Sequence, residues 1–332
     1  MSLYNKIIDL QKLNAAWDHV RKNKPAPGAD NITCEQFQEN RQEELTQLQI
    51  ELREHKYEVI PVRNVTVYKG EKERTIALYS MRDKVVQQSL AKELNRLYDS
   101  RLSSQAFAYR NKRSALDAAC EINNKILSGA YQWILRTDIS KFFDTIQWER
   151  MYGILKQEIR EEDVLELIRE NAKTKMLTPS GEIQDKLLGI HQGSGISPML
   201  SNIYLMEFDL WMDTKPVYFI RYSDDMLILG HSREELLSLL QQLQAHLEMY
   251  GLKLNQEKTI CSHIDAGADF LGYHFNKSGK SIPTKAETNL ENRFESIWLT
   301  SAGKSTEEKL EKIIAVIGGW KQYFIEKREI NL

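Results

Sequence analysis

The chain has 332 residues, 42% of them hydrophobic and 28% charged, values that are ordinary for a globular protein of two or three subdomains. Its net charge is −2, but residues 61–113 hold twelve Lys and Arg against five Asp and Glu, a local excess that phosphate binding requires. No membrane span or signal segment is evident, and Cys34, Cys120 and Cys261 form no zinc or disulfide pattern, so we expect a cytoplasmic protein.

Helices are predicted toward both ends of the chain, with strands gathered in the middle. Apolar residues recur at helical spacing or alternate as in strands, Ser197-Pro198 is typical of a helix start, and Gly251 of a helix end. The predicted helices are 36–55, 80–97, 114–127, 148–159, 162–173, 197–213, 232–250, 285–299 and 305–325. The predicted strands are 62–68, 74–78, 131–137, the two arms of a hairpin over 217–229, 270–275 and 281–282. This order indicates an α+β core with helical ends.

Two adjacent carboxylates, Asp224 and Asp225, lie between the apolar arms of the hairpin over 217–229. Placing acidic groups beside buried strands is costly unless they are paired or bind a metal. The spacing therefore predicts either a cation site at the hairpin tip or an exposed acidic turn.

A third carboxylate, Asp138, follows the apolar strand 131–137 and can share a cleft with Asp224. Oxygen ligands of this kind favour Mg²⁺, which is commonly held by one or two carboxylates and by substrate phosphates. Two such ions clamp the attacking and leaving oxygens of a phosphoryl transfer. The carboxylates are therefore compatible with a metal-dependent phosphoryl-transfer site, but two separated carboxylates are weakly specific because Asp is common at strand ends.

Eight short motifs in collinear order resemble those of a prokaryotic reverse transcriptase of the group II intron-like lineage. Asp138 with Phe142-Phe143 resembles polymerase motif A, Gln192-Gly193 with Ser197-Pro198 motif B, and Tyr222-Ser-Asp-Asp225 motif C. The remaining matches are the two fingers motifs, motif D, the primer grip and the last thumb helix, at 72–87, 107–110, 254–258, 270–272 and 319–324.

The resemblance implies a right-hand polymerase, an α+β fold with fingers, a palm built on a small antiparallel sheet, and a helical thumb. The fingers, with an N-terminal helical extension, would cover 1–130 and the thumb 276–332. The palm would cover 131–275, with a helical insertion at about 148–180.

The resemblance also implies the residues of the catalytic site. Asp138, Asp224, Asp225 and the backbone carbonyl of Ile139 would hold two Mg²⁺ ions, with Mn²⁺ as a possible substitute, and Asp225 would be the auxiliary acid. Lys258 would protonate the leaving pyrophosphate, unless it is only a surface lysine.

The same resemblance assigns residues to the substrates. Phe143 would exclude the ribose 2′-hydroxyl, unless it is only a core aromatic residue. The other implied contacts are Lys69, Lys72 and Arg74 with the triphosphate, Arg110 with the template or triphosphate, and Gln192 and Gly193 with the nascent base pair.

The sequence departs from the intron enzymes at several positions. Arg74-Thr stands where they usually have Arg-Pro. His191 stands where they usually have the proline before Gln-Gly, and this histidine either stacks on the template or caps a turn. Intron-encoded enzymes normally continue after the thumb into DNA-binding and endonuclease segments, which we do not expect in this protein.

The resulting interpretation is an RNA-directed DNA polymerase in antiphage defence. Its expected partners are an RNA template (a noncoding RNA), a DNA primer or product, dNTPs, an accessory protein and a homo- or hetero-oligomer, without a membrane. The alternatives are spacer acquisition in a CRISPR system, template-independent or protein-primed nucleotide addition, and a non-catalytic RNA-binding scaffold.

Overall fold

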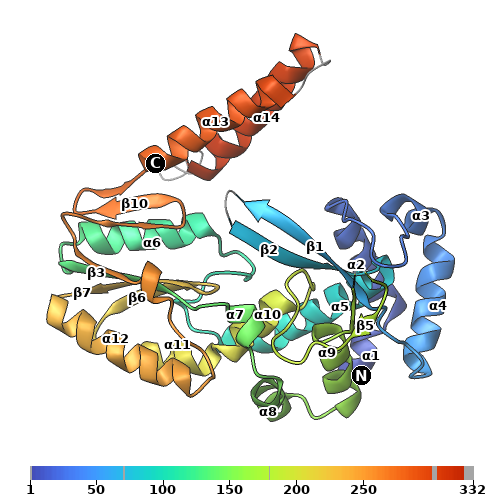
Figure 1. Cartoon of the computed structure of the whole chain (residues 1–332). Helices are drawn as coiled ribbons and strands as arrows, with labels where there is room; N and C mark the ends of the chain where they lie inside the picture. The colour runs from blue at the N-terminus through green and yellow to red at the C-terminus, as the bar shows by residue number, and fades with distance from the viewer. Residues whose placement is uncertain (1, 70–71, 179, 301–304, 325–332) are drawn as a thin grey trace. The chain divides into compact units, whose positions relative to one another are not determined.

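The computed structural model in Figure 1 describes residues 2–69, 72–178, 180–300 and 305–324, with Tyr68, Lys69 and Lys72 described by their backbone only. The chain forms two compact units that alternate along the sequence. The first consists of Met1–Asn111, Ile139–Lys215 and Gln242–Asn255, and the second of Lys112–Asp138, Pro216–Gln241 and Gln256–Leu332. Within the described ranges, no helix is long and apolar enough to cross a membrane.

The first unit is mostly helical. Its longest helix, α5 (Met81–Tyr98), begins at Ser80, whose hydroxyl accepts a hydrogen bond from the Asp83 N–H and caps the helix. The N-terminal helices α1 (Leu3–Ile7), α2 (Leu10–Lys22) and α4 (Arg41–Arg53) contact α5. The other helices of this unit are α3 (Cys34–Glu39), η1 (Asp99–Arg101), α7 (Phe142–Thr145), α8 (Trp148–Glu158), α9 (Glu162–Ala172), α10 (Ser197–Tyr204) and α11 (Met206–Met212).

A four-stranded sheet in the same unit has the order β2-β1-β4-β5. Strands β1 (Val62–Lys69) and β2 (Lys72–Leu78) form an antiparallel hairpin, and the short β4 (Met176–Leu177) and β5 (Ile183–Gln184) extend it beside β1. Val62, Ala77 and Tyr79 form a buried cluster at the base of the hairpin.

The second unit contains an antiparallel sheet of order β6-β7-β3-β8, with β3 (Trp133–Asp138), β6 (Tyr218–Tyr222), β7 (Asp225–Gly230) and β8 (Ile260–His263). Most residues of β3, β6 and β7 are buried, so this sheet is the core of the unit. Helix α6 (Ala115–Leu127) contacts β6 and a smaller sheet of β9 (Ala268–Phe270), β10 (Tyr273–Asn276) and β11 (Gly279–Ser281). The chain continues into the paired helices α13 (Thr284–Thr300) and α14 (Thr306–Phe324).

Helix α12 (Arg233–Glu248) runs from the second unit into the first, and the 3₁₀ helix η2 (Gln256–Lys258) precedes β8. The predicted helix 232–250 is thus confirmed with shorter ends, and Gly251 follows it with a φ of +70°.

Three predicted elements differ from the structure. The helix predicted over 36–55 is two helices, α3 and α4, separated at Asn40, and the helix predicted to run from Ser197 to 213 is divided at Leu205 into α10 and α11. The strand predicted over 270–275 is a hairpin, because Leu271 and Gly272 both have positive φ, the combination that a type I′ turn requires.

Candidate active site

The three predicted carboxylates lie at one edge of the β6-β7-β3-β8 sheet. Asp138 is the last residue of β3 and Asp225 the first of β7, and the antiparallel register places them directly opposite each other. Asp224 precedes Asp225 in the two-residue turn between β6 and β7. The sheet therefore brings together residues that the sequence keeps far apart.

A buried arginine supports the turn that carries Asp224. Ser223 has a φ of +62°, which is costly for a residue other than glycine, and Asp224 is not among the residues of positive φ, a combination found in type II′ turns. Arg221 is fully buried, and its Nη1 donates a hydrogen bond of 2.9 Å to the Ser223 carbonyl oxygen. Sequence reasoning missed Arg221, although an arginine inside an otherwise apolar strand was a signal for it.

Two cations accompany the carboxylates. Lys258, in η2, forms an ion pair with Asp138, and a guanidinium nitrogen of Arg136 lies 3.6 Å from a carboxylate oxygen of Asp225. The hydroxyls of Thr137 and Thr259 lie 2.7 Å apart and join β3 to the segment that follows Lys258. Lys258 was predicted, whereas Arg136 was missed, although it precedes Asp138 by two residues on the same strand face.

Burial, with neighbouring negative charge, raises the pKa of both Asp224 and Asp225. Burial raises the pKa of Asp225 to about 6, with Arg136 opposing and Asp224 and Asp138 reinforcing the shift. Burial also raises the pKa of Asp224, and the Asp138 charge adds to this effect. Three carboxylates against two cations leave a local excess of negative charge, which an added cation relieves.

The donor set fits a divalent cation. One oxygen of Asp138 and one of Asp225, Oδ1 in each, are buried and lack a hydrogen-bond partner in the described part of the chain. No three acidic, His or Cys side chains among the described residues form a metal-binding group by themselves. Mg²⁺ needs no such group, since substrate phosphates supply part of its coordination.

The first unit contains the residues expected at the substrates. Phe143 lies in α7, half-buried beside the buried Phe142, and Arg74 is exposed on β2. The side chains of Lys69 and Lys72 lie outside the described residues, although their backbones pair at the end of the β1–β2 hairpin. Ile139 directly follows Asp138 and pairs with Leu254 in an isolated bridge.

The loop that contains Gln192 and Gly193 lies against β2. The Gln192 carbonyl accepts a hydrogen bond of 2.7 Å from the Ala77 N–H. Gly193 has a φ of +107°, and a Cβ there would be 2.5 Å from the Ala77 carbonyl oxygen, so only glycine fits. His191 is buried, with Nε2 at 2.7 Å from the Thr174 carbonyl oxygen, and burial lowers its pKa to about 4.

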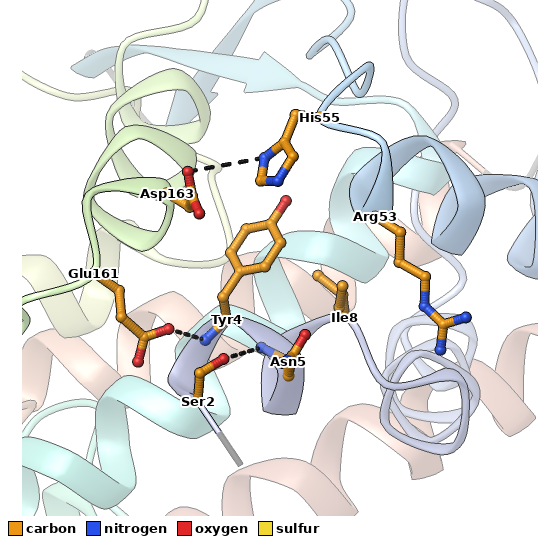
Figure 2. A pocket seen from close by; sticks show the side chains of 8 residues that line it. All are labelled: Ser2, Tyr4, Asn5, Ile8, Arg53, His55, Glu161 and Asp163. Atoms are coloured by element: carbon orange, nitrogen blue, oxygen red, sulfur yellow. Dashed lines mark hydrogen bonds and ion pairs between the residues drawn. The ribbon is translucent and has the colours of Figure 1, made fainter.

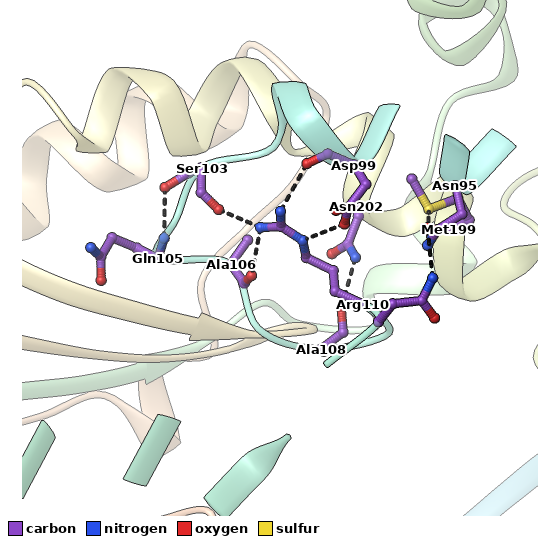
Figure 3. Close-up of polar contacts among 10 residues, drawn as sticks. Asn95, Asp99, Ser103, Gln105, Ala106, Ala108, Arg110, Met199 and Asn202 are labelled. Carbon is purple, nitrogen blue, oxygen red and sulfur yellow. Dashed lines mark hydrogen bonds and ion pairs between the residues drawn. The ribbon is translucent and has the colours of Figure 1, made fainter. Parts of the chain in front are cut away.

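Arg110 makes an internal network that sequence reasoning did not foresee. Figure 3 shows its guanidinium donating to the Asp99 carboxylate and to the backbone carbonyls of Asp99, Ser103 and Ala106. The side chain is 7% exposed. These four hydrogen bonds give Arg110 a structural role in closing the segment 99–110, and binding to template or triphosphate stays a prediction.

A cavity of about 450 Å³ lies at the N-terminal end of the first unit, and none of the predicted site residues lines it (Figure 2). Tyr4 stacks on His55 there, and His55 lies 3.8 Å from Asp163. The cavity and the carboxylate site therefore have no residue in common.

The chain is similar to a known protein family and to several known proteins. Residues 67–275 match the family described as "Reverse transcriptase (RNA-dependent DNA polymerase)". A protein of COX1/OXI3 intron 1 from Saccharomyces cerevisiae is 25% identical over 86% of this chain and 41% of its own length. Protein YkfC of Escherichia coli is 24% identical over 76% of both chains. Group II intron-encoded protein LtrA of Lactococcus lactis is 22% identical over 82% of this chain and 56% of its own.

The chain spans about two fifths of the length of the yeast intron proteins, 41% for the intron 1 protein and 38% for the intron 2 protein. Among solved structures, apo telomerase from Candida tropicalis matches with a TM-score of 0.54 and 13% identity, covering 80% of this chain and 58% of that one. Telomerase from Candida albicans matches with 0.51 and 15%, covering 81% and 57%. The predicted α+β fold of right-hand polymerases is thereby confirmed.

Proposed function

The chain belongs to the reverse transcriptase (RNA-dependent DNA polymerase) family, and from that premise we propose that it is an RNA-directed DNA polymerase that extends a primer with dNTPs. The observation that carries the proposal is the edge where Asp138 faces Asp225 and Asp224 occupies the adjoining turn. Such a group of carboxylates, with two buried oxygens that lack partners among the described residues, is suited to a divalent cation.

Asp138, Asp224, Asp225 and the Ile139 carbonyl would hold two Mg²⁺ ions, or Mn²⁺ in their place. The ions would activate the primer 3′-hydroxyl and neutralise charge on the triphosphate. Following the family resemblance, we assign Asp225 the auxiliary part and give Asp138 and Asp224 the main one; each of Asp138 and Asp225 already has a cation beside it, Lys258 and Arg136 respectively. Lys258, already at this edge, is the proton donor for the leaving pyrophosphate.

The remaining assignments concern the substrates. Phe143 excludes the ribose 2′-hydroxyl, and Arg74 with Lys69 and Lys72 binds the triphosphate. Gln192 and Gly193 support the nascent base pair, for which the exposed Gly193 backbone offers a surface without side chains. For Arg110, contact with the template or triphosphate stays a prediction, since its side chain is 7% exposed and donates four hydrogen bonds within the segment 99–110.

Primer extension on an RNA template with Mg²⁺ and dNTPs tests the proposal. Asp224→Asn should lower the rate by about 10²- to 10³-fold, because the variant loses a preorganised charge at the reacting centre. Asp265→Asn is the matched control, since this exposed residue lies in the same unit and its ion pairs within the described ranges are with His263 and Lys277. Full activity of the Asp224 variant would refute the metal assignment.

We further propose that the template is a noncoding RNA and that the setting is antiphage defence. Sequencing the RNA and DNA that copurify with the protein tests this. One recurrent noncoding RNA with complementary DNA supports the proposal, whereas RNA fragments that match CRISPR spacers support the alternative. DNA without a complementary RNA would indicate template-independent or protein-primed synthesis.

A further inference from the structure

The loop Gly193–Gly195 presents a backbone without side chains. Gly193 and Gly195 are exposed, and Ser194 between them is buried. Elements beneath the loop leave little room for larger residues, since a Cβ would be 2.5 Å from the Ala77 carbonyl oxygen at Gly193 and 3.3 Å from the Gln87 Cβ at Gly195. The loop therefore packs closely against β2 and α5.

Gln87 of α5 is the side chain that anchors the far end of this loop. It is fully buried, and its Oε1 accepts a hydrogen bond of 2.8 Å from the Gly195 N–H. The near end is anchored separately, by the Ala77 N–H on the Gln192 carbonyl. The Gln87 side chain thus holds the backbone N–H of Gly195, a glycine that is otherwise exposed to water.

The chemistry of Gln87 indicates a task other than filling space. Its Nε2 is buried and has no hydrogen-bond partner within the described residues. Burying an unsatisfied amide nitrogen is unfavourable, and methionine would occupy a similar volume without that penalty. A glutamine at position 87 is therefore explained by its side-chain oxygen, which accepts the hydrogen bond from Gly195.

We propose that Gln87 is a positioning residue that holds the Gly193–Gly195 backbone in place through Gly195 and thereby sets how the nascent base pair rests on it. The inference rests on the proposed function, since the base pair is a substrate of that reaction. A base pair on a rigid surface is held in one geometry, so a loosened loop accepts mismatched pairs more readily.

Hydrogen exchange on the full chain tests the positioning without any activity. Gln87→Met should raise the exchange rate of the Gly195 amide about tenfold, because its acceptor is removed. Gln87→Glu keeps an acceptor oxygen and should exchange like the wild type. Gln88→Met is the matched control, with the same substitution on the next residue of α5, which is only half-buried. Unchanged exchange in Gln87→Met, or equal acceleration in the Gln88 and Gln87→Glu variants, would overturn the proposal.

Single-nucleotide incorporation tests the consequence. Gln87→Met should raise the KM for the correct dNTP and the frequency of misincorporation about tenfold, with kcat at saturating dNTP within about threefold of wild type. Gln87→Glu should restore the wild-type KM and the wild-type frequency of misincorporation. The melting temperature of Gln87→Glu shows whether any loss of activity in that variant reflects unfolding. Unchanged selectivity, or a fall in kcat alone, would refute the role of Gln87. A wild-type protein that extends no primer would instead refute the proposed function, leaving the exchange result valid.

Discussion

The buried guanidinium of Arg221 donates a hydrogen bond to the carbonyl oxygen of Ser223, the residue whose positive φ forms the turn that carries Asp224. A residue other than glycine pays about 1–3 kcal/mol for this conformation. The turn between β6 and β7 is therefore strained at Ser223, and the hydrogen bond from Arg221 stabilises it.

Substitution at Ser223 should expose this strain. Ser223→Gly should raise the free energy of unfolding by about 1 kcal/mol, because glycine adopts positive φ without steric cost. Ser223→Val should lower it by about 2 kcal/mol, since a β-branched residue is strained there. Denaturant titration measures both, and a valine variant as stable as the wild type would show that the turn is unstrained.

Lys258, which forms an ion pair with Asp138, has two roles that substitutions can separate: it supplies positive charge, and it is proposed to donate a proton. Lys258→Arg keeps a positive charge beside Asp138 but hardly releases a proton, whereas Lys258→Met loses both properties. If Lys258 is the proton donor, both variants should slow incorporation by about 10²-fold, with the arginine variant retaining more stability. Rapid-quench kinetics and thermal melting make the comparison, and an arginine variant with the wild-type rate would exclude proton donation.

The neighbouring rings of Phe142 and Phe143 differ in burial. Phe142 is 2% exposed and belongs to the core, whereas Phe143 is half-buried. Phe143→Ala should let ribonucleotides compete with dNTPs while the fold persists. Phe142→Ala should instead cost about 3–5 kcal/mol of stability, through loss of a buried ring. Incorporation of rNTPs and dNTPs, measured beside unfolding, distinguishes the two, and unchanged sugar selectivity in Phe143→Ala would refute the steric role.

Asp83 should make stability depend on pH. It accepts hydrogen bonds from the Tyr57 hydroxyl, the Ser80 hydroxyl and the Ile60 N–H, and burial raises its pKa from 3.8 to about 6. The folded state thus binds the proton more tightly than the unfolded state, so this group adds stability as pH falls from about 7 to 4. The gain is about 3 kcal/mol at most.

Asp83→Asn removes this titration, because an amide does not ionise in that range. The difference in unfolding free energy, wild type minus variant, should grow as pH falls from 7 to 4. Urea titrations at several pH values measure it. A constant difference would show that Asp83 has the same proton affinity in both states.

Local pattern was enough to predict the main elements of the second unit. Asp138 at the end of an apolar strand and Asp224 with Asp225 between two others were predicted at one site, and the structure places all three at the same edge. Boundaries were less certain, as at Asn40 and Leu205, where neither glycine nor proline marks the break between two helices.

The sequence by itself determined the strands that end or begin at Asp138 and Asp225 and the order of the motifs along the chain, because spacing and apolar periodicity are local properties. Only the tertiary structure decided the partners of individual residues: Arg136 for Asp225, Lys258 for Asp138 and Gln87 for Gly195. In the tertiary structure Arg110, expected at a substrate, also donates hydrogen bonds to backbone carbonyls of its own segment. The physical reason is that hydrogen bonds and ion pairs depend on which strands and helices meet, and that follows from packing of the whole core rather than from neighbouring residues.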